Sequence, residues 1–364
     1  MKINILPKIS FLLVISSFSL VHAMDSLEDR ICANLKQGAF GKTGAIRLNE
    51  MTCGKKDPIA VPVTELTGKS DDQARSQLKT MGVEYLFNFN NADLTRPSGQ
   101  KKYFIKDFMH NAVAESQTEN FSAQSCLIKD GTQSESFARF DRFSENDSMG
   151  GYLLVQENDS TVTNLKSNEA FTIGTWVKIK TDYHAKTADG YFPIFSKTAL
   201  NTKTQAGQTE WEFKLTSEVA YLNINRNGQF QNNLNRQLPW WADRFGSCYE
   251  NNISRECWHF VAISVNPAEH KYSVMMLRKF ADELPGNNVE FFENYETSIS
   301  QDNVPIVAST KTALRIGGSN TNTMDGMLKG TFFAKRALSQ DEMRAIATYT
   351  TPAKEASLTC APAK

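Results

Sequence analysis

The stretch from residue 312 to residue 349 has an order of elements that few folds accommodate. Residues 312–318 predict a strand, residues 325–334 predict a second strand after a loop, and a tight turn then leads into a short helix. Ser339 and Glu342 have the spacing of a capping box at the start of that helix. Because so short a helix is marginal in isolation, we expect it to dock on the rest of the fold.

The sequence also defines the buried side and the end of this helix. Leu338 precedes the cap and Met343 occupies the fourth helical position, which is the spacing of a hydrophobic staple. Met343, Ile346 and Ala347 form one apolar face, and Pro352 ends the helix soon afterwards. The docking side is therefore predicted to be the one that carries these three residues.

Residues 1–23 have the features of a secretory signal peptide. Lys2 and Lys8 form a basic region, the run from Ile9 to Leu20 is apolar, and Ala23 closes a cleavage site of the small-residue type. The apolar run is too short for a membrane span, and no other segment is apolar enough to span a bilayer. We expect an exported chain, extracellular or periplasmic, without a membrane span.

The charge balance excludes one class of partner. The chain has 40 basic and 40 acidic side chains, and removal of residues 1–23 takes away only Lys2 and Lys8. A nearly neutral surface without long charge runs gives no electrostatic footprint for nucleic acid. We therefore expect no nucleic-acid partner.

The cysteine count suggests disulfide bonds. An even number of cysteines in an exported chain, without any Cys-x-x-Cys, indicates disulfides and not a metal site. The six cysteines are Cys32, Cys53, Cys126, Cys248, Cys257 and Cys360. Proximity favours Cys32–Cys53 and Cys248–Cys257, which leaves Cys126–Cys360 to tie the tail back, but the sequence does not resolve the connectivity.

Four parts follow from these patterns: a signal peptide (1–23), a small disulfide-bearing segment (24–81), a strand-rich domain (82–352) and a tail (353–364). The second part ends in a helix with Ser70 as its cap and Gln73 completing the box. Ala74 and Leu78 face inward, and Gly82 follows the end of the helix.

From residue 82 onward the pattern becomes that of strands at short intervals. The segments concerned are 83–89, 136–155, 171–179, 219–225, 258–265 and 272–280. Asn227-Gly228, which follows the segment 219–225, is the strongest hairpin signal in the chain. Many short strands with a single terminal helix predict an all-β sandwich or barrel.

Two of these segments, together with the C-terminal stretch 312–349, carry a resemblance to a known family. The strands Phe171–Ile179 and Trp258–Val265, together with the strand–loop–strand–helix order of 312–349, resemble laminin G-like jelly rolls of the concanavalin A-like lectin/glucanase superfamily. The resemblance implies an antiparallel β-sandwich over residues 82–352, with the short C-terminal helix docked against it. The resemblance says very little about the ligand, because proteins with the same fold have many different functions.

The superfamily includes glycoside hydrolases, which use two carboxyl groups that flank the scissile bond. Glu210 and Glu212 lie two apart on a predicted strand and would share one face. The retaining glucanases carry Glu-x-Asp-x-x-Glu or a close variant; here an aspartate is missing and Lys214 follows Phe213. We favour a strand with a solvent-facing polar side, and we expect no enzymatic activity.

A stretch with paired tryptophans is the better candidate for ligand binding. Trp240 and Trp241 follow a proline, and neighbours in a strand point to opposite faces, so at least one ring is a candidate for exposure. Aromatic rings stack on sugars while amides bind their hydroxyl groups. The nearby candidates are Asn232, Asn235 and Tyr249. Alternatively, the two tryptophans plug the end of the sandwich.

A calcium site is a weaker expectation that rests on the resemblance. Relatives often hold Ca²⁺ at a sandwich rim with oxygen ligands, and Asp141, Asp147 and Asp325 lie in loops that suit this role. Lys329 and Gly330 stand where many relatives have an acidic pair, which counts against it. The alternative is that these aspartates are solvated turn residues.

The leading hypothesis is a secreted, non-enzymatic recognition protein that binds carbohydrate or a glycoprotein surface, with a role in adhesion. The second hypothesis is a protein–protein interaction or surface-scaffold module. The third is a glycoside hydrolase with an unusual pair at Glu210 and Glu212.

Overall fold

The structure is a computed structural model of the 364-residue chain. It describes residues 66–89, 94–95, 103–116, 127–129, 136–140, 152–159, 162–163, 165, 169–179, 192–199, 209–216, 219–226, 229–237, 247–250, 253–280, 289–296, 312–318, 324–352 and 359–360. The signal peptide and the pair Cys32 and Cys53 lie outside the described residues. All described residues belong to a compact unit that begins at Val63.

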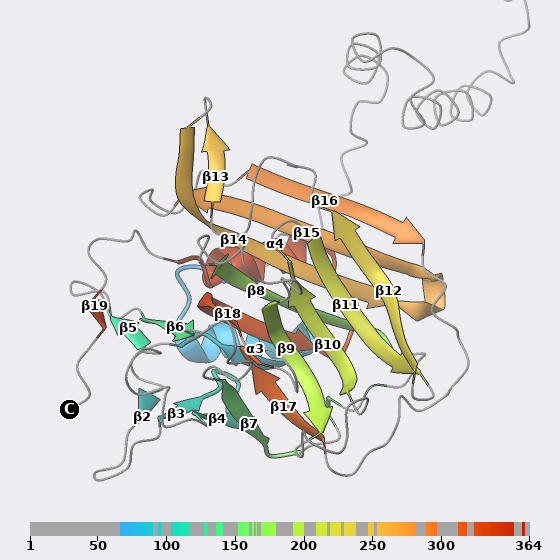
Figure 1. The fold of residues 1–364 in the computed structure, drawn as a ribbon. Coiled ribbons are helices and arrows are strands. Elements are labelled where there is room, and N and C mark those ends of the chain that lie inside the picture. The colour runs from blue at the N-terminus through green and yellow to red at the C-terminus, as the bar shows by residue number, and fades with distance from the viewer. Residues whose placement is uncertain are drawn as a thin grey trace, which may run out of the picture. The chain divides into compact units, whose positions relative to one another are not determined.

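The described part of this unit is an antiparallel β-sandwich of two sheets (Figure 1). One sheet has the order β16-β15-β14-β8-β18-β6-β5-β19; in addition β1 pairs with β18, and β13 with β14. Its strands are β1 (Val83–Phe87), β5 (Leu127–Lys129), β6 (Ser136–Phe140), β8 (Phe171–Ile179), β13 (Ser247–Glu250), β14 (Ile253–Asn266), β15 (Lys271–Phe280), β16 (Val289–Glu296), β18 (Gly326–Ala334) and β19 (Thr359–Cys360). A 3-10 turn, η4 (Pro267–Glu269), joins β14 to β15.

The other sheet has the order β12-β11-β10-β9-β17-β7-β4-β3-β2. Its strands are β2 (Leu94–Thr95), β3 (Phe104–Lys106), β4 (Ala112–Ser116), β7 (Leu153–Glu157), β9 (Phe192–Ala199), β10 (Thr209–Leu215), β11 (Val219–Arg226), β12 (Gln229–Gln237) and β17 (Thr312–Ile316). Within the described residues it has nine strands, and the sheet above has ten. The antiparallel sandwich expected from the sequence is confirmed.

The main core lies between the two sheets and is rich in aromatic side chains. Trp211 of β10 stacks on Phe333 of β18, with ring centroids 5.8 Å apart, and Phe195 meets Trp211 edge-on at 5.5 Å. All three side chains are fully buried. Contacts of this kind hold the two sheets together, because each ring buries a large apolar area that water would otherwise cover.

Two helices cover the outer face of the ten-stranded sheet. Helix α3 (Asp71–Thr80) has a complete capping box at Ser70 and Gln73, and Ala74 and Leu78 are buried, as expected from the sequence. Gly82, with φ +73°, follows the C-cap residue Met81 in the left-handed conformation that glycine adopts without strain.

Helix α3 belongs to the packing of the sandwich. Leu78 shares a buried cluster with Trp176, Trp258 and Phe332 of the sheet. The sequence placed this helix in a separate segment that ends at residue 81, whereas the compact unit already begins at Val63. The other expected domain limits stay predictions.

Helix α4 (Gln340–Tyr349) docks on the same face (Figure 1). Its capping box at Ser339 and Glu342 is complete, and Met343, Ile346 and Ala347 are fully buried, so the predicted docking side is confirmed. The indole nitrogen of Trp176 donates a 2.9 Å hydrogen bond to the carbonyl oxygen of Ala347, which fixes the helix on the sheet.

The hairpin signal Asn227-Gly228 is also confirmed by the strands on either side of it. β11 and β12 pair in antiparallel register from Arg226↔Gln229 onward. None of the described helices is long and apolar enough to cross a membrane.

Candidate functional site

A row of polar side chains crosses the outer face of the nine-stranded sheet. The direct cross-strand partners, from β11 to β4, run Asn223, Glu212, Ser196, Arg315, Leu154 and Glu115. We call the five polar members of this series the polar row. They come from the consecutive strands β9, β10 and β11 and from β4 and β17, which are distant in the sequence. The register of the sheet brings the five side chains into line.

Alternation along the strands places this row on the side away from the core. Trp211 and Phe213 flank Glu212 in β10, and both are fully buried in the core between the sheets. Leu314 and Ile316 flank Arg315 in β17 in the same way. Because successive side chains of a strand point to opposite faces, Glu212 and Arg315 point outward.

The outward position does not make the row solvent-exposed. The exposed fractions are 1% for Asn223, 8% for Glu212, 0% for Ser196, 2% for Arg315 and 9% for Glu115. A buried polar group costs free energy unless it is hydrogen-bonded or paired. The partners of each member therefore decide what the row can do.

Several members have partners. The Ser196 hydroxyl donates a 2.7 Å hydrogen bond to the carbonyl oxygen of Gly318. Lys214 Nζ lies 3.4 Å from Glu212 Oε2, and Gln156 Nε2 donates to Glu115 Oε2 over 2.7 Å. These contacts provide partners for Ser196, Glu212 and Glu115.

The Arg315 guanidinium lies at the centre of the row and faces an aromatic ring. Its Cζ atom is 5.0 Å from the centroid of Tyr152. Burial lowers the pKa of Arg315, and the neighbouring Tyr152 opposes that shift. The row thus has a central cation with negative groups, Glu212 and Glu115, on both sides of it.

Asn223 differs from the other members of the row. Among the contacts of the described residues, neither Oδ1 nor Nδ2 of this side chain has a hydrogen-bond partner. Buried amides in native proteins are almost always satisfied, so an unsatisfied one points to a water molecule or a bound polar ligand. Asn223 is the direct partner of Glu212, so the free amide and an ion-paired carboxylate stand side by side.

The edge strand β12 brings two of the predicted ligand-binding residues to this end of the row. Asn235 is the register partner of Tyr221, which in turn pairs with Lys214. Asn232 falls in the irregularity of the β11–β12 ladder opposite Asn223. Their backbone positions therefore adjoin the free amide.

The remaining predicted ligand-binding residues are not placed together with these two. Trp240 and Trp241 lie outside the described residues, which in β12 end at Gln237. Tyr249 is in β13, which pairs with β14 of the opposite sheet. The role of the paired tryptophans stays a prediction.

The expected face-sharing of Glu210 and Glu212 rests on strict alternation, and β10 is irregular at this point. The pairing of β10 with β9 shifts register between Thr209 and Trp211, which is the position of Glu210. The shared face of Glu210 and Glu212 therefore stays a prediction.

The structure describes only one of the three expected calcium ligands. Asp141 and Asp147 lie outside the described residues. Asp325 immediately precedes β18 and is buried, with 3% of its side chain exposed. The calcium site therefore stays a prediction.

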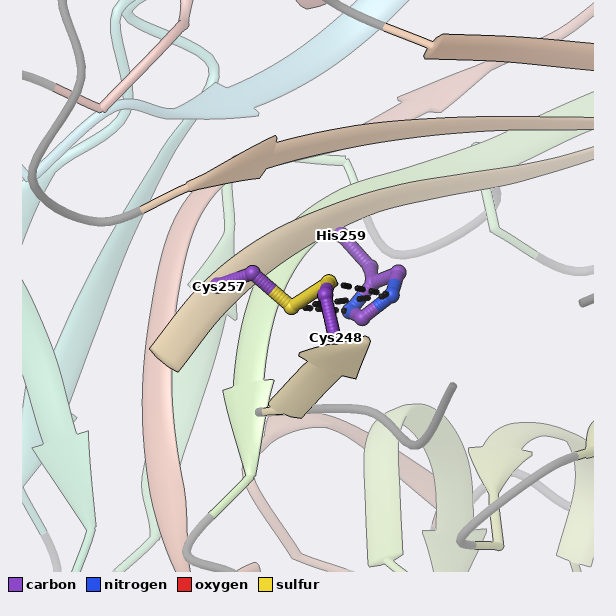
Figure 2. Close-up of side chains that lie close together, drawn as sticks. All are labelled: Cys248, Cys257 and His259. Carbon is purple, nitrogen blue, oxygen red and sulfur yellow. Dashed lines mark hydrogen bonds between the residues drawn. A yellow bond between two sulfur atoms is a disulfide. The ribbon is translucent and has the colours of Figure 1, made fainter. Parts of the chain in front are cut away.

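The Cys248–Cys257 disulfide is confirmed, with Cα atoms 5.9 Å apart (Figure 2). It links β13 to the start of β14, and the ring of His259 lies against it. Cys248 Sγ is 3.6 Å from His259 Nε2, and Cys257 Sγ is 3.8 Å from Nδ1. Burial, together with the positive charge of Arg278, lowers the pKa of His259 to about 3.

The tail returns to the sheet as the third expected disulfide requires. Cys360 in β19 pairs with Ile128 of β5, which begins one residue after Cys126. Cys126 itself lies outside the described residues, so the Cys126–Cys360 bond stays a prediction.

Sequence reasoning missed Asn223, Ser196 and Arg315. Each looks like an ordinary outward residue of a strand when its own segment is read alone. Their alignment depends on the pairing of β9 with β17, which are separated by more than a hundred residues. No local signal in the sequence encodes that register.

No protein-family model matches this sequence, and no curated protein matches it significantly. Solved structures with some similarity have low scores. The binding domain of botulinum neurotoxin serotype G gives a TM-score of 0.38 at 10% identity, over 71% of this chain and 49% of that chain. This chain therefore spans about half the length of the neurotoxin domain.

Two further structures are similar to the same degree. Domain 4 of AbnA, a GH43 extracellular arabinanase from Geobacillus stearothermophilus in complex with arabinotriose, has a TM-score of 0.38 and 11% identity, over 73% of this chain and 98% of that chain. A Trypanosoma rangeli sialidase gives a TM-score of 0.36 and 11% identity, over 78% of this chain and 38% of that chain. Similarity this weak carries no information about the ligand.

Proposed function

We propose that this protein is a non-enzymatic recognition protein that binds carbohydrate or glycoconjugate at the Asn223 end of the polar row, where the ligand reaches the buried amide beside the partly exposed Lys214 and Tyr221. The observation that carries the proposal is the Asn223 amide, which is buried and without a partner among the described residues, next to the Glu212–Lys214 pair. An amide both donates and accepts hydrogen bonds, and so does a sugar hydroxyl group.

The chemistry of the neighbouring side chains supports a sugar as the ligand. Carboxylates accept, guanidinium and ammonium groups donate, and the row presents both kinds in successive strands spaced about 4.8 Å apart. Tyr221 and Tyr152 are partly exposed beside the row and offer aromatic surface for stacking. The positions of Asn232 and Asn235 extend the amide-rich end.

The spacing of the carboxylates supports recognition without hydrolysis. Glycoside hydrolases that retain configuration need two carboxyl groups about 5–5.5 Å apart, and inverting enzymes somewhat more. Glu212 and Glu115 are four strands apart in the sheet, which corresponds to roughly 19 Å. Glu212 also has Lys214 beside it, which favours a structural ion pair.

The proposal also covers the type of sandwich and the export of the chain. We place the sandwich in the laminin G-like type, supported by the strands β8 and β14 and by helix α4 after β18. Export is supported by the Cys248–Cys257 disulfide, because such bonds persist in oxidising compartments.

The experiment is a glycan-array screen of the oxidised chain 24–364, run with calcium and again with a chelator. The proposal expects a defined set of bound glycans; loss of binding under chelator would add the calcium site. A blank array under both conditions would overturn the proposal and favour a protein partner, which a pulldown would then identify.

The Trp240→Ala/Trp241→Ala double variant separates two roles of the tryptophans. If the rings stack on the ligand, binding is lost and the melting temperature stays unchanged. A large fall in melting temperature would instead show that they plug the end of the sandwich.

A further inference from the structure

We propose that reduction of the Cys248–Cys257 disulfide converts this corner of the sandwich into a metal site for a thiolate-preferring divalent ion such as Zn²⁺, with His259 as the third ligand. This inference is independent of carbohydrate binding. Figure 2 shows the three side chains converging, and their ligand atoms all lie within 4.8 Å of one another.

The strands hold these ligands in place whether or not the disulfide is present. Cys257 and His259 lie two apart in β14 and share one face of the sheet. Cys248 is held by the β13–β14 ladder, in which it is the direct partner of Arg255. The backbone pairing thus keeps the sulfur atoms near the imidazole after the S–S bond is broken.

In the oxidised protein both sulfur atoms are bonded to each other and are poor ligands. A dithiol transfers two electrons and two protons to the bond, leaving two cysteine thiols and the oxidised dithiol. A divalent ion then displaces the two thiol protons, and both are released to solvent. The neutral His259 ring supplies its nitrogen lone pair without releasing a proton.

The distances suit tetrahedral coordination. With Zn–S of about 2.3 Å and Zn–N of about 2.0–2.1 Å, a tetrahedral ion requires S···N of about 3.6 Å and S···S of about 3.8 Å. Measured to the single ring nitrogen Nε2 of His259, the S···N distances are already 3.6 Å from Cys248 and 3.9 Å from Cys257. Only the sulfur atoms have to move apart, and breaking their bond permits that movement.

The surroundings favour thiolate ligands. Cys248, Cys257 and His259 are completely buried, and a divalent ion with two thiolates and a neutral imidazole has no net charge to bury. The guanidinium groups of Arg255 and Arg278 lie over the ring of Phe280, at 4.0 Å and 5.4 Å from its centroid. Phe280 packs on the two cysteines, so positive charge stands close to the sulfur atoms.

Access to the buried site is available through β13. This four-residue strand pairs only with β14 within the described part of the sheet. A short strand with one neighbour opens locally at lower cost than a central strand, which admits the dithiol and the ion.

The test uses the full mature chain with Cys32, Cys53, Cys126 and Cys360 replaced by Ser, so that only the two relevant thiols remain. The chain is reduced with excess dithiol, freed of it under inert gas, and titrated with Co²⁺. We expect a thiolate-to-cobalt charge-transfer band that saturates at one ion per chain, is absent before reduction, and is lost in His259→Gln.

A second measurement covers the case in which these variants do not fold. Reduced wild-type chain is alkylated with iodoacetamide with and without Zn²⁺, and the labelled cysteines are identified by mass spectrometry. We expect Zn²⁺ to slow the labelling of Cys248 and Cys257 by at least about tenfold. Equal labelling rates with and without the ion, or a cobalt band that persists in folded His259→Gln, would overturn the proposal.

Discussion

Asn223 of β11 and Glu212 of β10 are direct cross-strand partners on the outer face of the nine-stranded sheet, yet only Glu212 has a partner side chain there. An unsatisfied buried amide destabilises a protein unless a ligand or water compensates. The pair therefore marks a position where stability and binding should respond in opposite directions to the same substitution.

Asn223→Leu should stabilise the ligand-free protein while it weakens ligand binding. Removing the unsatisfied amide and filling its volume with an apolar side chain should raise the free energy of unfolding by about 1–3 kcal/mol in the ligand-free protein. Denaturant unfolding of the two proteins measures the change. Ser196→Ala is the matched control: it breaks the bond to Gly318 and should lower stability by about 1 kcal/mol. A loss of stability in Asn223→Leu would mean that the amide has a structural partner.

Lys197→Met should be strongly destabilising. Lys197 Nζ lies 3.5 Å from Glu157 Oε2 inside the sandwich, and the side chains are only 1% and 4% exposed. Without the lysine, the carboxylate is buried without its cation, at a cost of about 3–5 kcal/mol. Denaturant unfolding gives the value.

A surface pair provides the control for this prediction. Lys271 and Glu269 are 4.0 Å apart and more than half exposed, so Lys271→Met should change stability by less than about 1 kcal/mol. Similar losses of unfolding free energy in both lysine variants would show that burial does not determine how much the Lys197–Glu157 pair stabilises the protein.

His259 should make the oxidised protein less stable in acid. The pKa of His259 is lowered to about 3 in the folded state, so between pH 6.5 and pH 3 the unfolded chain binds a proton that the folded chain does not. The contribution of His259 to stability is therefore lost as the pH falls through this window, by up to about 1.4 kcal/mol per pH unit. Unfolding free energies across this range, compared with those of His259→Leu, measure the effect; equal slopes would contradict it.

Asp107 should act in the opposite direction. Burial raises the pKa of Asp107 to about 7, although backbone N–H groups of Leu86, Met109 and Asn111 donate to its carboxyl and counteract the shift. The folded chain then holds a proton between pH 3.8 and pH 7 that the unfolded chain has released. Stability from this group is present below pH 3.8 and is lost as the pH rises towards 7.

The two groups nearly cancel between pH 4 and pH 6.5, so the wild type should show a flat profile there. In Asp107→Asn, the free energy of unfolding should fall as the pH is lowered, because only the effect of His259 remains. In His259→Leu, it should fall as the pH is raised, because only the effect of Asp107 remains. A flat profile in both variants would contradict the two assignments.

Several elements of the fold were predictable because short sequence motifs specify them. The capping residues Ser70 and Ser339 fix the helix starts, and the Cys248–Cys257 spacing fixes a disulfide across one turn. Trp211 and Phe213 alternate with Glu212 along the sequence, and both side chains lie in the core. These features depend on residues close together in the chain, so the sequence reveals them directly.

The candidate site was less predictable because it depends on register. Ser196 meets Arg315 only because β9 pairs with β17, and the ladder between β9 and β10 shifts register between Thr209 and Trp211. Lys197 would be expected at a surface, yet it pairs with Glu157 in the interior. Pairing between distant strands is set by the packing of the whole sandwich, and single segments do not carry that information.

The measurement that tests the account most directly is a binding titration of one glycan identified on the array against the wild type and Asn223→Leu. If sugars bind across the polar row, the folded and more stable Asn223→Leu protein should bind at least about tenfold more weakly, since a lost hydrogen-bonding amide costs about 1–3 kcal/mol. Unchanged affinity in this variant would place the carbohydrate elsewhere on the molecule and contradict the role assigned to the polar row.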